Sequence, residues 1–266
     1  SYTSRRYRPG SGLVPSGCQL SRGIRTARNA GGADPSPRTS VSVLITARMG
    51  VCRRGVAVRI KICGITRPED AEKALALGAD TVGCVFHASS ARHVTEEIAR
   101  DIQGAVGGAG TLVGLFVDPT GDRVREVLDR VELDVLQFHG QESPAFCEQF
   151  GRPYLKAVAM SAHVDLAAIN SAFRSARGLL LDSAHDGQFG GTGHQFDWEW
   201  VDAGLEKRLV LAGGLTADNV GDAIRQVRPA AVDVSSGVEK EKGIKDSDRM
   251  RAFIEVALSE ISEGGL

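Results

Sequence analysis

Two different apolar patterns alternate along most of the chain. Residues 59–65 place Ile60 and Ile62 on one side of an extended segment and Cys63 on the other, which is the two-residue period of a strand. Residues 68–77 repeat small and apolar side chains at intervals of three and four, which predicts a helix with one face packed on a sheet. A strand followed at once by a helix is the repeating unit of an α/β protein.

This strand–helix unit occurs eight times after residue 58. The predicted strands are residues 59–65, 81–86, 111–117, 135–138, 154–158, 178–181, 209–212 and 231–234. The predicted helices are residues 68–77, 96–102, 122–130, 144–150, 164–173, 198–204, 219–227 and 246–260. Eight units in about 200 residues match a single-domain (β/α)8 TIM barrel of the α/β class. A doubly wound open sheet is the alternative, but it usually has fewer strands and a G-x-G-x-x-G turn after the first, and neither feature is found.

Residues 1–58 have a different composition. They hold ten arginines, no lysine and a single acid, Asp34, and they are rich in serine, glycine and proline. Such a segment cannot bury enough apolar surface to fold alone, so we expect it to be largely disordered and separate from a catalytic domain of residues 59–266. Three interpretations remain: an organellar transit peptide, an extension upstream of a start at Met49, and a nucleic-acid-binding arm, which the scattered arginines disfavour.

Charge and cysteine content narrow the class of protein. Residues 59–266 carry 22 basic and 32 acidic side chains, which argues against nucleic acid as the main partner. No run of about 18 apolar residues exists, so we expect no transmembrane helix. The five cysteines show no C-x-x-C or Cys/His metal spacing, which suits a reducing compartment and predicts no metal site. We expect a cytoplasmic protein, or a plastid protein if the first segment is a transit peptide.

Candidate catalytic residues stand where predicted strands end. In a barrel of this kind the loops after the strands carry the active site. Cys63 lies near the end of the first strand, and Thr66 with Glu69 has the spacing of a capping box that would start the next helix. Asp182 follows the sixth strand, three strands from the first in a closed ring, so it should face Cys63 across the mouth. Cys84 and Cys147, which lack such a position, are interpreted as small buried apolar residues.

Glycine and serine residues follow the seventh and eighth predicted strands. They are Gly213, Gly214, Ser235, Ser236 and Gly237. Glycine lets backbone N–H groups approach an anion closely, and a helix N-terminus adds a favourable partial charge. Because these two loops are the usual phosphate site of (β/α)8 barrels, the sequence predicts a phosphate ester as ligand.

A set of short motifs occurs in one order and carries a resemblance to a known family. The motifs are KICGIT at 61–66, SARHV at 90–94, GLFVD at 114–118, LQFHG at 136–140, LLLD at 179–182, GGTG at 190–193 before FDW at 196–198, LAGGL at 211–215 and DVSSGVE at 233–239. Each motif alone is weak, but the ordered set is specific. Together they resemble the phosphoribosylanthranilate isomerases of tryptophan biosynthesis over essentially all of residues 59–266.

The resemblance implies an Amadori rearrangement that needs neither a metal nor an organic cofactor. A small phosphoribosyl substrate, N-(5-phosphoribosyl)anthranilate, would be converted to an open-chain 1-deoxyribulose 5-phosphate, with Cys63 as general base and Asp182 as general acid. Acid and base on opposite sides of one sugar suit this reaction, because ring opening needs a proton and the next step removes one from C2′. We expect Lys61 or a helix N-terminus to lower the pKa of Cys63.

The resemblance also implies a role for Arg92, which stands at the arginine of the family's S-P-R-Y-V segment. There it would contact the anthranilate carboxylate or the reacting centre through its guanidinium. Ala91 and His93 depart from that segment, and the loss of the proline predicts a looser loop.

Three further residues are expected at the site. Lys61 and Asp233 face inward on strands that are neighbours in a closed barrel, so we expect a buried ion pair that supports the site. Direct contact of Asp233 with substrate is the alternative. His139 is expected either to hydrogen-bond the substrate or to fill the mouth.

Two other functions fit the same pattern less well. A metal-dependent phosphosugar isomerase or epimerase would need several ligands at strand ends, and His139, Asp118 and Asp182 form only a thin set. A barrel that binds phosphate without catalysis would not need both Cys63 and Asp182. The sequence leaves the oligomeric state open between monomer and homodimer.

Overall fold

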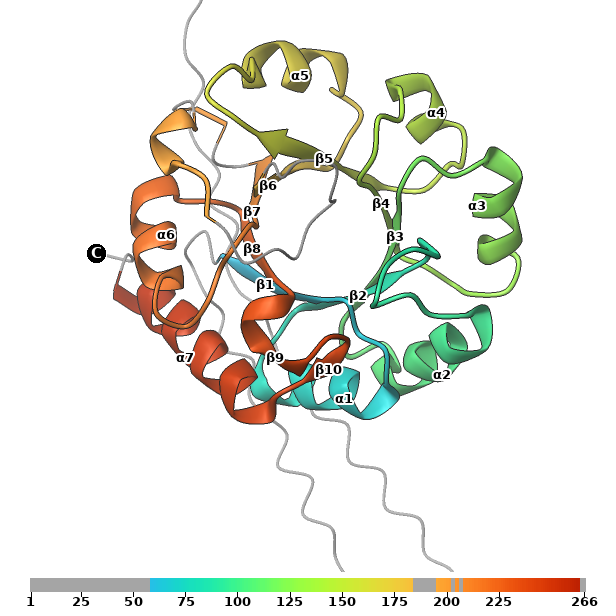
Figure 1. Ribbon diagram of the computed structural model, residues 1–266, viewed down its shortest axis with the longest axis horizontal. Helices are drawn as coiled ribbons and strands as arrows, with labels where there is room; N and C mark the ends of the chain where they lie inside the picture. Colours follow the sequence, from blue (N-terminus) through green and yellow to red (C-terminus); the bar gives the residue numbers. More distant parts are fainter. Residues whose placement is uncertain (1–57, 184–194, 202–203, 206–207, 264–266) are drawn as a thin grey trace, which may run out of the picture. The chain divides into compact units, whose positions relative to one another are not determined.

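The computed structural model describes residues 58–183, 195–201, 204–205 and 208–263, with side chains to residue 260. Within this part, eight parallel strands form a closed barrel in chain order, and β1 pairs with both β2 and β8 (Figure 1). The predicted TIM barrel is therefore confirmed. The open-sheet alternative is wrong, because pairing of β1 with β8 leaves the sheet no free edge.

Strands and helices alternate around the ring (Figure 1). The barrel strands are β1 (Arg59–Cys63), β2 (Thr81–Val85), β3 (Thr111–Phe116), β4 (Val135–Phe138), β5 (Tyr154–Met160), β6 (Gly178–Ser183), β7 (Leu209–Leu211) and β8 (Ala231–Val234). The α-helices are α1 (Pro68–Leu77), α2 (Glu96–Val106), α3 (Gly121–Leu128), α4 (Pro144–Glu148), α5 (Leu166–Ala172), α6 (Val220–Val227) and α7 (Ser247–Glu263). A short helix, η3 (Ser236–Val238), and a hairpin of β9 (Glu239–Glu241) and β10 (Ile244–Lys245) follow β8, and the sequence did not predict the hairpin.

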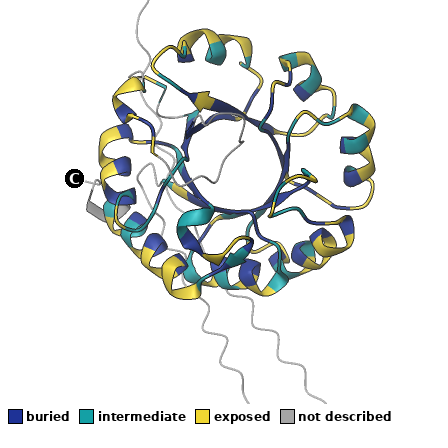
Figure 2. Ribbon diagram, viewed as in Figure 1, coloured by how far each residue is buried: buried dark blue, intermediate teal, exposed yellow. Residues whose placement is uncertain are grey.

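Alternation along the strands sorts the buried side chains into two layers. Ile60 and Ile62 belong to the large cluster that fills the space between strands and helices. Val113, Leu180 and Val210 belong to a separate cluster of inward-facing residues. Figure 2 shows the ring of strands buried and the helices buried only on the side that faces it. The interior of the barrel is therefore a packed core and not a pore.

The start of α1 differs from the predicted capping box. Arg67, rather than Thr66, is the N-cap residue, and no side chain caps the helix there. The Thr66 hydroxyl instead donates to the carbonyl oxygen of Gly243 at 2.5 Å. The predicted capping box is therefore wrong, because the Thr66 hydroxyl bonds to a residue far along the chain and does not cap the helix.

The helix predicted at residues 198–204 is also wrong in its extent. Among the described residues of this range, the short 3-10 helix η1 (Trp198–Trp200) is the helical part, and Val201 is already extended, with ψ 114°. None of the helices in the described part of the chain combines the length and apolarity needed to cross a membrane. Residues 1–57 and the GGTG motif lie outside the described residues, so the predicted domain boundary after residue 58 stays a prediction.

Candidate active site

A cavity opens at the carboxyl ends of the barrel strands, where the sequence predicts the site. Predicted residues that line it are Cys63, Arg92, His139, Asp182, Gly213, Gly214, Asp233, Ser235 and Ser236. Lys61 and Gly237 do not line this cavity, although each contacts elements that do. The barrel thus gathers at one end residues that are scattered over more than a hundred positions in the sequence.

Cys63 is the last residue of β1 and is 6% exposed. Its register partner on β2 is Gly83, where an added Cβ would lie 3.1 Å from the Cys63 sulfur and 3.4 Å from the Lys61 nitrogen. The glycine therefore leaves room for the thiol and the ammonium group to lie together. Sequence reasoning missed Gly83, although a glycine inside a predicted strand is a sign of close approach.

The expected lowering of the Cys63 pKa is wrong. Burial raises the pKa of this thiol above its ordinary value, and the charge of Asp233 acts in the same direction. The Lys61 ammonium group lowers the pKa, but not enough to outweigh burial. The structure therefore favours the neutral thiol when the cavity holds no ligand.

Lys61 and Asp233 form the expected ion pair, with 2.9 Å between Nζ and Oδ2 and both side chains almost fully buried. Burial alone would lower the pKa of Lys61, but Asp233 raises it above its ordinary value, so the ammonium group stays charged. The other carboxylate oxygen of Asp233, Oδ1, has no hydrogen-bond partner in the described part of the chain.

Replacing Lys61 with methionine should destabilise the fold. The change leaves Asp233 buried without its counter-charge, which costs about 3 kcal/mol of unfolding free energy. Urea unfolding followed by circular dichroism measures this loss. The exposed Lys242 offers the matched control Lys242→Met, for which we expect a change within about 0.5 kcal/mol. Equal stability of the two variants would contradict a stabilising pair.

Asp182 and His139 are in direct contact. The His139 Nε2 lies 3.2 Å from Asp182 Oδ2, and Asp182 Oδ1 accepts from the backbone N–H of Ser183 at 2.8 Å. On the other side of the ring, the Gln137 amide nitrogen lies 3.0 Å from His139 Nδ1. The Gln137 amide and the Asp182 carboxyl group therefore contact the two nitrogens of the His139 ring and hold it between them. His139 thus orients Asp182, a contact that sequence reasoning did not foresee.

Arg92 enters the cavity from the loop after β2. Its side chain passes over Gly64, where an added Cβ would clash with it and would lie 2.9 Å from Ser235 Oγ. The backbone of this loop is fastened by the N–H of Arg92 to Ser90 Oγ at 3.1 Å and by the N–H of Val94 to the carbonyl of Val85 at 3.0 Å. These two bonds hold the loop backbone around Ala91, and the looser loop expected there stays a prediction.

The loops after β7 and β8 pack against each other at Gly237. An added Cβ there would overlap the carbonyl oxygen of Leu215, so only glycine lets the two backbones come this close. Gly213 and Gly214 have φ values of +80° and +65°, in the left-handed region. The glycines of both loops are therefore required by the backbone geometry, and Gly237 lies behind the cavity wall rather than in it.

A second buried ion pair shapes the loops after β3 and β4. Lys156 Nζ lies 2.7 Å from Glu142 Oε2, and Glu142 Oε1 accepts from the backbone N–H of Asp118 at 2.9 Å. Glu142 also accepts from Gly140, the residue after His139. Neither partner of this pair carried a sequence signal.

The described residues contain no cluster of His, Cys, Asp or Glu side chains with the geometry of a metal site.

Comparison with known proteins agrees with this arrangement. Residues 60–256 match the family described as N-(5'phosphoribosyl)anthranilate (PRA) isomerase. An N-(5'-phosphoribosyl)anthranilate isomerase of Pseudomonas fluorescens (strain Pf0-1) is 54% identical over 198 residues, which cover 74% of this chain and 97% of the relative. The crystal structure of phosphoribosyl anthranilate isomerase from Thermus thermophilus is 34% identical, with a TM-score of 0.69, over 76% of this chain and 99% of that one.

A further solved structure shows the isomerase in complex with reduced 1-(o-carboxyphenylamino)-1-deoxyribulose 5-phosphate. It is 38% identical to this chain, with a TM-score of 0.67, and the match covers 76% of this chain and 99% of that one. Sequence, fold and the residues gathered at the strand ends therefore agree on one assignment. The chain belongs to the N-(5'-phosphoribosyl)anthranilate isomerase family.

Proposed function

We propose that this chain catalyses the Amadori rearrangement of N-(5-phosphoribosyl)anthranilate in tryptophan biosynthesis, with Cys63 as general base and Asp182 as general acid. The observation that carries the proposal is the placement of both groups in one cavity, at the ends of β1 and β6. The cavity would take a small-molecule substrate, and a related isomerase has been solved in complex with reduced 1-(o-carboxyphenylamino)-1-deoxyribulose 5-phosphate.

The two groups act in sequence on the sugar. Asp182 protonates the furanose oxygen, the ring opens to an imine, and Cys63 removes the C2′ proton to give the enolamine, which tautomerises to the ketone. The contact between His139 Nε2 and Asp182 Oδ2 holds the Asp182 carboxyl group in the orientation from which it donates to the sugar. Lys61 beside Cys63 stabilises the thiolate when the base has to be charged.

The ends of the substrate find complementary groups on either side of the reacting centre. Arg92 offers a guanidinium group to the anthranilate carboxylate. The loops after β7 and β8 offer backbone N–H groups and the hydroxyls of Ser235 and Ser236 to the phosphate. Holding both ends fixes C2′ between acid and base. Such positioning of the reacting groups supplies a large part of an enzyme's rate enhancement.

The fluorescence of the substrate's anthranilate group tests the proposal directly. Addition of the purified chain should accelerate the loss of this fluorescence well beyond the spontaneous rate, and the rate should scale with enzyme concentration. Prior addition of a chelator should leave the rate unchanged, because no step of the proposed mechanism uses a metal. No acceleration over the spontaneous rate would sink the proposal.

Gly213→Ala should weaken substrate binding. At Gly213 an added Cβ would lie 2.7 Å from the backbone nitrogen of Ser183 and 3.2 Å from Asp182 Oδ1, so the loop has to move. We expect KM to rise roughly tenfold, because misplaced phosphate contacts weaken ground-state binding.

Gly108→Ala is the matched control, since Gly108 has nearly the same φ, +79°, but an added Cβ meets nothing within 4 Å. Both variants should lose about 1–2 kcal/mol of stability from the left-handed backbone. Only Gly213→Ala should change KM. A KM that changes equally in both would show that backbone strain, and not the phosphate loop, is responsible.

A further inference from the structure

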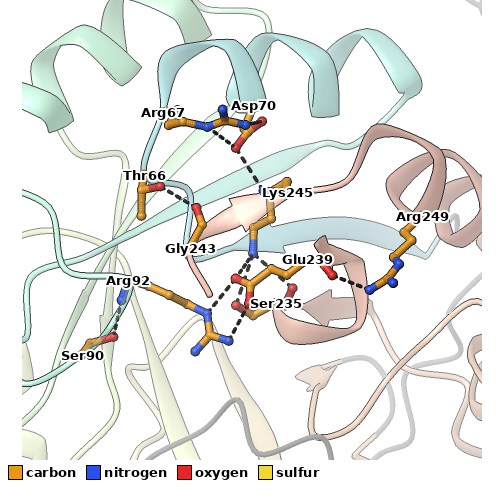
Figure 3. Close-up of polar contacts among 10 residues, drawn as sticks. All are labelled: Thr66, Arg67, Asp70, Ser90, Arg92, Ser235, Glu239, Gly243, Lys245 and Arg249. Carbon is orange, nitrogen blue, oxygen red and sulfur yellow. Dashed lines mark hydrogen bonds and ion pairs between the residues drawn. The ribbon is translucent and has the colours of Figure 1, made fainter. Parts of the chain in front are cut away.

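The side chain of Glu239 joins two regions of the cavity that the proposed function treats as separate. Its Oε1 and Oε2 accept from Arg92 Nε and Nη2, each at 2.8 Å, in a bidentate pair (Figure 3). Its Oε1 also accepts from Lys245 Nζ at 2.9 Å. One carboxylate that is nearly inaccessible to solvent thus holds two cations from different segments of the chain.

Lys245 carries this connection to the loop after β8. Besides Glu239, its Nζ donates to the carbonyl oxygen of Ser235 at 3.1 Å and to Ser235 Oγ at 3.3 Å (Figure 3). The Lys245 side chain is completely buried, so these bonds are not exchanged with water. Moving Glu239 would therefore release Lys245 and, with it, the backbone and hydroxyl of Ser235.

The charges in this cluster favour the ionised pair. Burial acts to raise the pKa of Glu239, but Arg92 and Lys245 outweigh it and the pKa falls below its ordinary value. Burial lowers the pKa of Lys245, an effect that Glu239 partly offsets. Glu239 thus stays negatively charged. Removal of that charge would leave the buried cations of Arg92 and Lys245 without their counter-charge.

The hairpin that carries Glu239 and Lys245 is itself fastened to the start of α1. The backbone N–H of Lys245 donates to Asp70 Oδ2 at 3.2 Å, and Thr66 holds the Gly243 carbonyl (Figure 3). Arg249 of α7 donates to the backbone carbonyl of Glu239. Because its backbone is held from both sides, Glu239 can act as a fixed point for the long side chain of Arg92.

We propose that Glu239 is a positioning residue that couples the carboxylate-binding and phosphate-binding ends of the cavity, through Arg92 on one side and Lys245 with Ser235 on the other. This inference rests on the proposed function for the identity of the two ends. Glu239 touches no substrate atom in this view. It sets the distance between the two groups that do, so its loss should affect both ends of the ligand together.

Glu239→Gln tests the coupling, because it removes the charge with little change in volume. Inorganic phosphate and anthranilate, measured separately by calorimetric titration, report on the two ends of the cavity. We expect both dissociation constants to rise several-fold and kcat/KM to fall about 10- to 100-fold, mainly through KM. Glu241→Gln is the matched control, since Glu241 is exposed on the same hairpin.

Each outcome decides the matter. Weakening of both ligands in Glu239→Gln, with Glu241→Gln unchanged, supports the coupling, whereas weakening of only one ligand or of neither overturns it. Should Glu239→Gln fail to unfold cooperatively, Glu239→Asp is measured instead, because it keeps the charge but shortens the side chain that spans Arg92 and Lys245. It should weaken both ligands, and an unchanged affinity for either one overturns the coupling. Failure of the proposed function would be seen separately, as a wild-type chain that does not accelerate the isomerisation.

Discussion

Cys63→Ser should lower kcat by about 10²- to 10⁴-fold, the range that a general base contributes. A serine hydroxyl is a far weaker acid than a thiol, so it cannot be ionised to take the C2′ proton, although it occupies nearly the same space. The fold should survive, because Cys63 lines the cavity and makes no hydrogen bond that a hydroxyl could not make. Stopped-flow fluorescence with wild-type and variant enzyme at saturating substrate measures the loss of kcat.

Cys84→Ser provides the matched control. Cys84 is fully buried among the apolar residues between strands and helices, so the same atom exchange there should reduce stability but leave kcat unchanged. A Cys63→Ser enzyme with full kcat would remove the thiol from the mechanism.

Asp182→Asn should lower kcat by a similar factor of about 10² to 10⁴, because the amide cannot supply the proton for ring opening. Its carbonyl oxygen can still accept from the Ser183 N–H, so the end of β6 should keep its geometry. Asp165→Asn makes the same exchange at the N-cap of α5, where asparagine also caps well, and should leave kcat unchanged. Equal kcat in the two variants would rule out Asp182 as the acid.

The pH dependence of the Asp182→Asn enzyme should report on the ionisation of Cys63. With the acid removed, its residual kcat/KM should rise as the pH rises through neutrality, because the fraction of thiolate grows toward the pKa that burial has raised. The sign follows from the role, since a base works only after it has lost its proton. A residual rate that falls with pH would mean that Cys63 does not act as the base.

Local sequence pattern was sufficient for the barrel. Every predicted barrel strand is present with its ends shifted by no more than two residues, since strand and helix periods depend on neighbouring residues alone. The same period placed Cys63 and Lys61 on the inward face, and strand order placed Asp182 across from them. Signals that depend on one residue's hydrogen bond, such as the capping box at Thr66, failed because a distant acceptor competed for the hydroxyl.

The motifs carried the resemblance but not the contacts within the cavity. Glu239 is the last residue of the DVSSGVE motif. The spacing of the motifs did not predict that its carboxylate would pair with Arg92, 147 positions away. Lys245 and Glu142 lie outside any motif, and the sequence pattern did not predict the residues that they contact. Such pairs form only when the barrel closes and the loops fold over its end.

The sequence by itself therefore determined the eight strand–helix units, the cavity end of the barrel and the family to which the chain belongs. Only the tertiary structure decided which charges meet there and how Cys63 titrates. The pKa of a thiol depends on how much water the whole fold removes from around it and on charges brought in by other strands, here Lys61 beside it and Asp233 from β8. Burial is a property of the closed barrel, and no single segment of the chain contains it.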